Sequence, residues 1–335
     1  MKKLGVLGVL SLIVVIWISG CQGMAPSAPE APRVAPGRVV ETPEVDELHV
    51  FIAFGQSNMQ GPGTIRAQDR AGASDRWRVM NVVAGTYAGV AQTPGQWYRA
   101  VPPLIIPDNS LSHWTNSFTI GLGPLDYFGR TLAANIPDNI AVGVIAVAHG
   151  DLALAAFHRT RAEEYFAPGS GGAGREANRP STTERQGWTR YRNAGYASLF
   201  DAIITNARIA QEQGGVIKGI VFHQGESGRG LTYTTWPQML REIYDDMLYE
   251  LGLEPNSIPI LLGQTWNGGS GGTGGFLNAD NRIQNHIPNA WVIGTADLTQ
   301  GRVGQGQPDN IHFGSADLEE LGRRYAEKML DLIYR

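Results

Sequence analysis

Apolar positions along the chain alternate between short continuous runs and longer periodic segments. The short runs predict strands at 48–54, 78–83, 140–148, 216–223, 257–264 and 290–296. Segments with an apolar residue every three or four positions predict helices at 123–135, 194–213, 235–251 and 317–334. Near-continuous apolar strands separated by helices are typical of a parallel sheet covered on both faces. Ligands of such α/β domains bind beyond the carboxyl ends of the strands.

The first residues follow another pattern. A basic start at residues 1–3 precedes an apolar run from Leu4 to Ile18, which is too short for a comfortable membrane span and predicts an export signal over residues 1–20. The run ends in "ISGC", which resembles the bacterial lipobox and implies lipidation of Cys21, the only cysteine. Gln22 follows Cys21, and by resemblance to sorted lipoproteins this favours an envelope anchor in the outer membrane of a Gram-negative cell.

Proline-rich residues after Cys21 lack apolar periodicity and predict an extended tether over 21–47. The folded domain is therefore expected at 48–335, and without cysteine it has neither disulfides nor thiolate metal sites. Residues 1–20 contain two lysines and no acid, so their removal changes the formal charge from -4 to -6. This balance argues against nucleic acid as a partner.

Two glycine-rich stretches, 168–187 and 267–275, are too polar for a core and predict long loops. They are either mobile insertions or lids that contact substrate. Neither matches a phosphate-binding loop, because no Gly-Lys-Ser/Thr follows the glycines.

Ser57 comes directly after the first predicted strand, in "FIAFGQSNMQGPG". There its hydroxyl would lie above the sheet edge and its N–H near a helix N-terminus, which suits a nucleophile and a developing oxyanion. The alternative is a serine that caps a helix.

Asp309 and His312 stand three residues apart in "QPDNIHFG", in a predicted turn just before the last helix. The carboxylate can orient the imidazole while the other ring nitrogen faces a serine, which makes His312 a candidate base. A surface or helix-capping histidine is the alternative.

A third polar group, His223, Gln224, Gly225 and Glu226, ends another predicted strand. The side-chain amide of Gln224 could donate to an oxyanion at the same sheet edge. A satisfied polar strand end is the alternative reading of each residue taken singly.

Together, "GQSNM", "HQGES" and "DNIHF" resemble the motifs of the SGNH hydrolase superfamily, within the carbohydrate esterases that include acetylxylan esterases and the sialic-acid O-acetylesterase domain. The resemblance implies a flavodoxin-like three-layer α/β/α sandwich around a parallel sheet, with no metal or organic cofactor. It implies Ser57 as nucleophile, His312 as general base, Asp309 as its partner and Gln224 in the oxyanion hole.

One motif departs from that group, where paired glycines commonly follow the central strand. Here "HGD" makes Gly150 the best backbone donor to the oxyanion beside Ser57, and the adjacent Asp151 would oppose the charge unless it points away. Possible supporting residues are Gln56, Asn58, His223 and Glu226. For Glu226 a structural role is favoured over a direct action on His312.

An acetyl group on a plant-type polysaccharide such as xylan is the leading predicted substrate. Tryptophans in predicted loops could stack on sugars, although aromatics are more often packing residues: Trp97, Trp114, Trp188, Trp236 and Trp266. The alternatives are a sialate O-acetylesterase, a catalytically silent carbohydrate-binding lipoprotein and a structural lipoprotein of the envelope.

Overall fold

The computed structural model describes residues 45–108, 121–167, 180–226, 235–265, 282–298, 301–304 and 307–335. For 301–304 and 307–310 it describes the backbone alone. Several positions with predicted roles lie outside the described residues, namely Cys21, Trp114, Trp266 and the glycine-rich residues 168–179 and 267–275.

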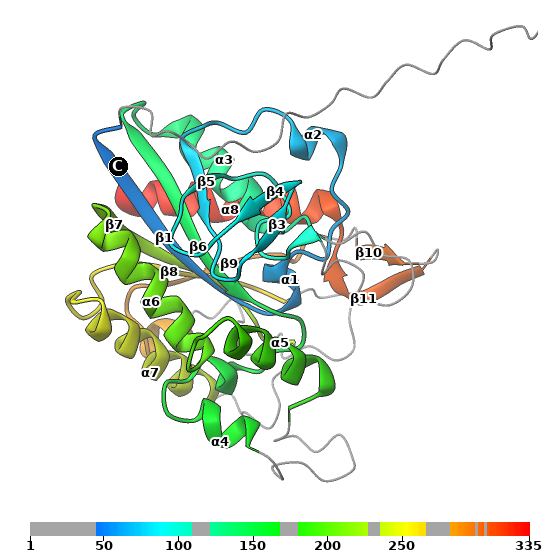
Figure 1. The fold of residues 1–335 in the computed structure, drawn as a ribbon, viewed down its shortest axis with the longest axis vertical. Helices are drawn as coiled ribbons and strands as arrows, with labels where there is room; N and C mark the ends of the chain where they lie inside the picture. The colour runs from blue at the N-terminus through cyan, green and yellow to red at the C-terminus, as the bar shows by residue number, and fades with distance from the viewer. Residues whose placement is uncertain are drawn as a thin grey trace, which may run out of the picture. The chain divides into compact units, whose positions relative to one another are not determined.

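A seven-stranded sheet forms the centre of the domain (Figure 1). Its strands run parallel except the short edge strand β5, which is antiparallel to β2. Every predicted strand is present, with ends within a few residues of those predicted. Across the sheet the order is β5 (Tyr98–Arg99), β2 (Trp77–Met80), β6 (Ile140–Ala148), β1 (Glu47–Gly55), β7 (Gly215–His223), β8 (Ile260–Gly263) and β9 (Ala290–Ile293).

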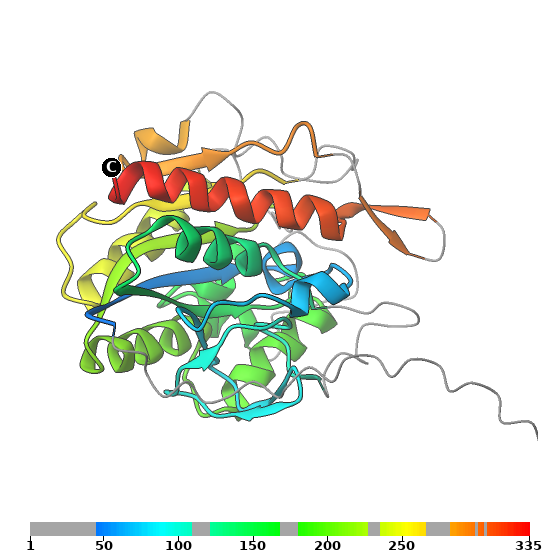
Figure 2. The same ribbon diagram turned by 90° about the horizontal axis from the view of Figure 1, so that it is seen from above.

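Helices cover both faces of the sheet (Figure 2). On β1, Phe51 and Ala53 face one core, and Val50, Ile52 and Phe54 face the other; none of these side chains is exposed. Burial on both sides explains why the strand is apolar throughout rather than alternating. The predicted three-layer α/β/α fold is confirmed: one face carries α3 (Pro124–Asn135) and α8 (Ser315–Ile333), the other α5 (Thr182–Asn193), α6 (Leu199–Glu212) and α7 (Thr235–Glu250).

The register of the central strands determines where the chain leaves the sheet. Gly55, the last residue of β1, pairs with Ala148 at the end of β6 and with His223 at the end of β7. Adjacent strands lie about 4.8 Å apart, so the three segments that follow emerge side by side at one level.

Two predictions about local structure were wrong. Residues 182–187, predicted as loop, form the first half of α5, because Ser181 and Glu184 make a capping box at its N-terminus. Asp309 and His312 lie in a strand rather than a turn, since β11 (Gln307–Phe313) pairs with β10 (Gly301–Gly304).

The remaining described elements are short. No helix in the described ranges is both long and apolar enough to span a bilayer. The short elements are α1 (Ser57–Gln60), α2 (Ala67–Arg70), β3 (Gly85–Tyr87), β4 (Val90–Gln92), η2 (Leu154–Phe157), α4 (Ala162–Phe166) and η3 (Arg282–Asn285).

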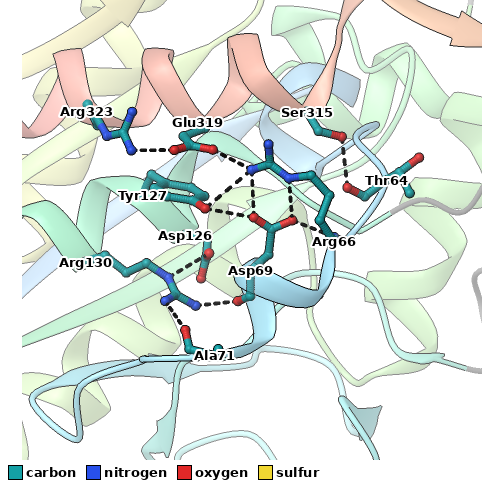
Figure 3. Close-up of polar contacts among 10 residues, drawn as sticks. All are labelled: Thr64, Arg66, Asp69, Ala71, Asp126, Tyr127, Arg130, Ser315, Glu319 and Arg323. Carbon is teal, nitrogen blue, oxygen red and sulfur yellow. Dashed lines mark hydrogen bonds and ion pairs between the residues drawn. The ribbon is translucent and has the colours of Figure 1, made fainter. Parts of the chain in front are cut away.

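A group of charged and hydroxyl side chains joins the segment after α1 to α3 and α8 (Figure 3). Asp69, which is fully buried, accepts from Arg66 Nη2 at 2.8 Å and from the Tyr127 hydroxyl at 2.8 Å. Arg66 also pairs with Glu319 on α8. Nearby, Ser315 Oγ at the start of α8 donates to the carbonyl of Thr64 at 2.9 Å. The contacts hold the beginning of α8 against the loop that follows α1.

Asp126, on α3 next to this group, is a second buried carboxyl. Arg130 Nε donates to its Oδ2 at 2.9 Å, whereas Oδ1 has no hydrogen-bond partner in the described part of the chain. Burial raises the pKa of Asp126 to about 7, despite the positive charge of Arg130.

The raised pKa of Asp126 predicts a pH dependence of stability. The folded state binds a proton at Asp126 that the unfolded state has released, so this group lowers the free energy of unfolding as pH rises from about 4 to about 7. The effect is on the order of 2–4 kcal/mol, and Asp126→Asn should remove it. Urea unfolding of both proteins across this range measures it, with Asp75→Asn at an exposed site as control. Identical slopes for wild type and Asp126→Asn would contradict the prediction.

Candidate active site

Ser57 begins the one-turn helix α1 directly beyond the end of β1. Gly55, with φ +153°, lets the chain pass against β7, where Gln56 N donates to the His223 carbonyl at 3.1 Å. A Cβ on Gly55 would lie 2.1 Å from that carbonyl oxygen, so only glycine fits. The strand therefore delivers Ser57 to the carboxyl edge of the sheet, as predicted.

Ser57 and His312 meet although they are 255 residues apart. His312 Nε2 lies 2.8 Å from Ser57 Oγ, within the range for a base that removes the serine proton. Ser57 is 4 % exposed, whereas His312 is half-buried. Asp309 lies on the same strand as His312, and its side chain is outside the described part of the structure. Its role as the partner of His312 stays a prediction.

Asn58, the residue after the serine, holds the backbone on both sides of His312. Its Nδ2 donates to the Ile311 carbonyl at 3.2 Å, and its Oδ1 accepts from Phe313 N at 3.2 Å. We call these two bonds the Asn58 bracket. Because Asn58 is fully buried, the bracket links α1 to β11 where water does not compete.

Glu226 fixes the amide orientation of Asn58. Glu226 Oε1 accepts from Asn58 Nδ2 at 2.6 Å and lies 3.4 Å from His223 Nε2. His223 Nδ1 in turn lies 3.0 Å from the Tyr325 hydroxyl on α8. Burial alone would raise the pKa of Glu226, but His223 and Asn58 outweigh it and hold this pKa below its ordinary value. Glu226 thus contacts the residue that brackets His312.

The loop after β6 carries Gly150. Its N–H donates to the side-chain Oε1 of Gln60 at 2.9 Å, and Gln60 is the last residue of α1. Asp151 has a left-handed backbone with φ +65°, a conformation that aspartate tolerates better than most residues. Burial lowers the pKa of the neighbouring His149 to about 4, so its imidazole is neutral at neutral pH.

One face of α5 supports this loop. Glu184 Oε1 accepts from Ala153 N at 2.8 Å, and the Tyr191 hydroxyl donates to the Ala148 carbonyl at 3.2 Å. Between them, the His149 ring lies against Gly187, where a Cβ would come within 2.7 Å of it. The spacing of these positions along α5 places all three on the same side of the helix.

Gln224 follows β7 at the same sheet edge and is fully buried. Its Oε1 accepts from the Trp236 indole at 2.9 Å, and its Nε2 donates to the Leu152 carbonyl at 3.4 Å. Its role in the oxyanion hole stays a prediction.

The described tryptophans that were candidates for sugar stacking pack inside the protein. Trp236 is unexposed and Trp188 stacks on Phe166, so both act as packing residues. Trp97 is partly buried against the core.

Sequence reasoning missed Gln60, the α5 support and the Tyr325 contact. The capping-box spacing from Ser181 to Glu184 was a usable signal for α5. The contacts of Gln60 and Tyr325 depend on tertiary structure, and the local sequence carries no sign of them.

The comparisons with known proteins point to one family. A family model described as carbohydrate esterase, sialic acid-specific acetylesterase, matches residues 47–331.

Solved structures with the same fold share little sequence with this chain. A protein from Arabidopsis thaliana aligns with a TM-score of 0.54 at 17% identity, over 84% of this chain and 98% of the other. NanS aligns with a TM-score of 0.51 at 17% identity, over 87% and 99%. XAC1771, a carbohydrate acetylesterase from Xanthomonas citri, aligns with a TM-score of 0.51 at 16% identity, over 85% of this chain and 57% of its own.

The Asn58 bracket predicts that Asn58→Ala slows the reaction of Ser57, although Ser57 and His312 themselves are unchanged. Loss of both bonds lets the His312 backbone shift, and a misplacement of about 1 Å can cost roughly a hundredfold in rate. The measurement is the second-order rate at which an aryl phosphonate labels Ser57, expected to fall about 10- to 100-fold, together with the thermal unfolding midpoint.

Asn135→Ala, at an exposed helix end, serves as control. Unchanged Ser57 labelling in folded Asn58→Ala would refute the role of the bracket. If the variant does not fold, Glu226→Gln tests the same support with a smaller change, since it removes the charge facing Asn58 and keeps an oxygen that can accept.

Proposed function

Because the chain belongs to the sialic acid-specific acetylesterase family of carbohydrate esterases, we propose that it removes acetyl groups from a plant-type polysaccharide such as xylan through Ser57, His312 and Asp309. The family makes it a carboxylic ester hydrolase and a carbohydrate acetylesterase. The 2.8 Å contact between Ser57 Oγ and His312 Nε2 is the observation that carries the proposed mechanism.

Acylation begins when His312 removes the Ser57 proton and Oγ attacks the ester carbonyl. The carbonyl oxygen becomes negative as the tetrahedral intermediate forms, and N–H donors at the sheet edge stabilise it. His312 then gives the proton to the departing sugar hydroxyl, which leaves acetyl-Ser57. A water molecule, deprotonated by His312, attacks this ester and releases acetate and free Ser57.

Asp309 would orient the His312 ring and stabilise its protonated form, as in other serine triads. Support for this role comes from the resemblance of "DNIHF" to the esterase motif, and Asp309 and His312 both lie in β11. Glu226 supports the triad indirectly, through Asn58.

Sialic acid carrying an O-acetyl group is the second candidate substrate. The family description favours it.

Acetate release from acetylated xylan and from O-acetylated sialic acid decides between these substrates. With xylan as substrate we expect acetate release that falls at least about a thousandfold in Ser57→Ala, as removal of a triad residue does in serine hydrolases. Release from the sialic acid alone would replace the first proposal by the second. Labelling of Ser57 by a phosphonate without acetate release from either points to another acyl group or sugar. Absence of labelling would favour the silent carbohydrate-binding lipoprotein.

We also propose that the protein is exported and anchored to the cell envelope through lipid on Cys21. The support is the short apolar run that ends in the lipobox-like "ISGC" and the proline-rich tether beyond it.

Cys21→Ser tests the anchor, because serine cannot carry the thioether-linked lipid. In a bacterial host, the wild-type chain should partition with membranes and incorporate a labelled fatty acid, and the variant should do neither. Equal membrane partitioning of both proteins, or a wild-type chain without label, would show that Cys21 is not the anchor.

A further inference from the structure

Gln60 links the nucleophile helix to the loop that follows β6. Its Oε1 accepts a hydrogen bond from the Gly150 N–H at 2.9 Å. An N–H group can only donate, so the amide oxygen must face Gly150 and the Nε2 hydrogens must face away from it. The orientation of this amide, often ambiguous in a glutamine, is therefore determined by its partner.

The Nε2 group of Gln60 is available as a donor. It has no hydrogen-bond partner among the described residues. The protein does not enclose it completely. The whole residue is only 3 % exposed. An unpaired, nearly buried N–H₂ group that still reaches open space is costly unless something there accepts from it.

Gln60 stands on the same short helix as Ser57. Residues three apart on a helix share a face, with Cβ atoms about 5–6 Å apart, so Ser57 and Gln60 stand on the same side of α1. The pairing of Gly55 with Ala148 brings the segments that carry Ser57 and Gly150 side by side. A side chain that starts beside Ser57 and ends on Gly150 must cross the gap between the two segments.

We propose that Gln60 Nε2 donates to the carbonyl oxygen of the acyl group while Ser57 attacks it. Gly150 then acts through Gln60, because its N–H polarises the amide and holds it in place, which strengthens the Nε2 donor. Gln60 neither gains nor loses a proton; its hydrogen bond shortens as the oxygen becomes negative and relaxes when the carbonyl reforms. This inference rests on the proposed acyl-transfer function.

A simpler role for Gln60 would be to anchor the Gly150 loop without contacting substrate. The variant Gln60→Glu distinguishes the two roles, because the carboxylate it introduces can still accept from Gly150 N–H and has no hydrogen to donate. Gln60→Ala removes both the anchor and the donor.

The experiment measures acetate release at the pH plateau and the rate of Ser57 labelling by an aryl phosphonate, whose P=O oxygen takes the place of the oxyanion. The proteins are wild type, Gln60→Glu, Gln60→Ala and the control Gln96→Glu at an exposed loop position. If Gln60 donates, Gln60→Glu and Gln60→Ala should each lose about 10²- to 10³-fold in both rates, and the control should not change. Full pH profiles separate this loss from a change in the pH dependence of the reaction caused by the added charge.

Near-normal rates in Gln60→Glu beside a large loss in Gln60→Ala would overturn the proposal and leave Gln60 as an anchor. Normal rates in both variants would overturn it as well. Failure of the acetylesterase function gives another pattern, in which wild type releases no acetate. Phosphonate labelling then still reports on Gln60, and a wild-type Ser57 that does not react at all would end both proposals. Thermal unfolding midpoints confirm that each variant is folded.

Discussion

The site depends on one constraint, the level at which three neighbouring parallel strands stop. β6, β1 and β7 end in register at Ala148, Gly55 and His223. Strand spacing alone then places the segments carrying Gly150, Ser57 and Glu226 within one or two strand widths of each other. A one-residue slip would turn the side chains of a strand to the opposite face, and apolar packing on both faces opposes such a slip. The same packing that stabilises the sheet therefore aligns the chemistry.

Two buried carboxyl groups, Glu226 and Asp126, have pKa values shifted in opposite directions. Glu226 accepts from Asn58 and faces His223, and these contacts keep its pKa low despite burial. Asp126 accepts from Arg130, but here burial outweighs the partner and raises the pKa; in each carboxyl group the second oxygen has no hydrogen-bond partner among the described residues. A charged Glu226 gives Asn58 Nδ2 a strong acceptor, which leaves Oδ1 as the end of the amide that accepts from Phe313 N. The carboxyl group next to the site is thus the one whose contacts favour its charged form.

Much of this arrangement could be predicted from the sequence. Doubly buried strands are apolar throughout, so the central sheet is visible in the pattern, and the position of Ser57 follows from the strand before it. The helix α5 was missed because glycines preceding it dominated the reading of 168–187, although Ser181 and Glu184 carry a capping signal. The strand β11 was missed because a polar two-stranded ribbon leaves no apolar run. Side-chain contacts such as that of Asn58 with the backbone around His312 join residues more than 250 positions apart, and periodicity does not report them.

The unusual sequence after β6 can be understood together with α1. In the resembled esterases paired glycines commonly occupy this place, whereas here Gly150 stands between His149 and Asp151. The left-handed backbone of Asp151 shapes the turn, and the His149 ring lies against Gly187 on α5. With the Gly150 N–H bound to Gln60, the backbone donor expected at this position is already paired. An oxyanion here needs either to displace a good hydrogen bond or to use the amide that this bond orients. The second course keeps the bond between Gly150 N–H and Gln60 and gives the unpaired Gln60 Nε2 group an acceptor. Since an unmade buried hydrogen bond is costly, this course is the one that the contacts favour.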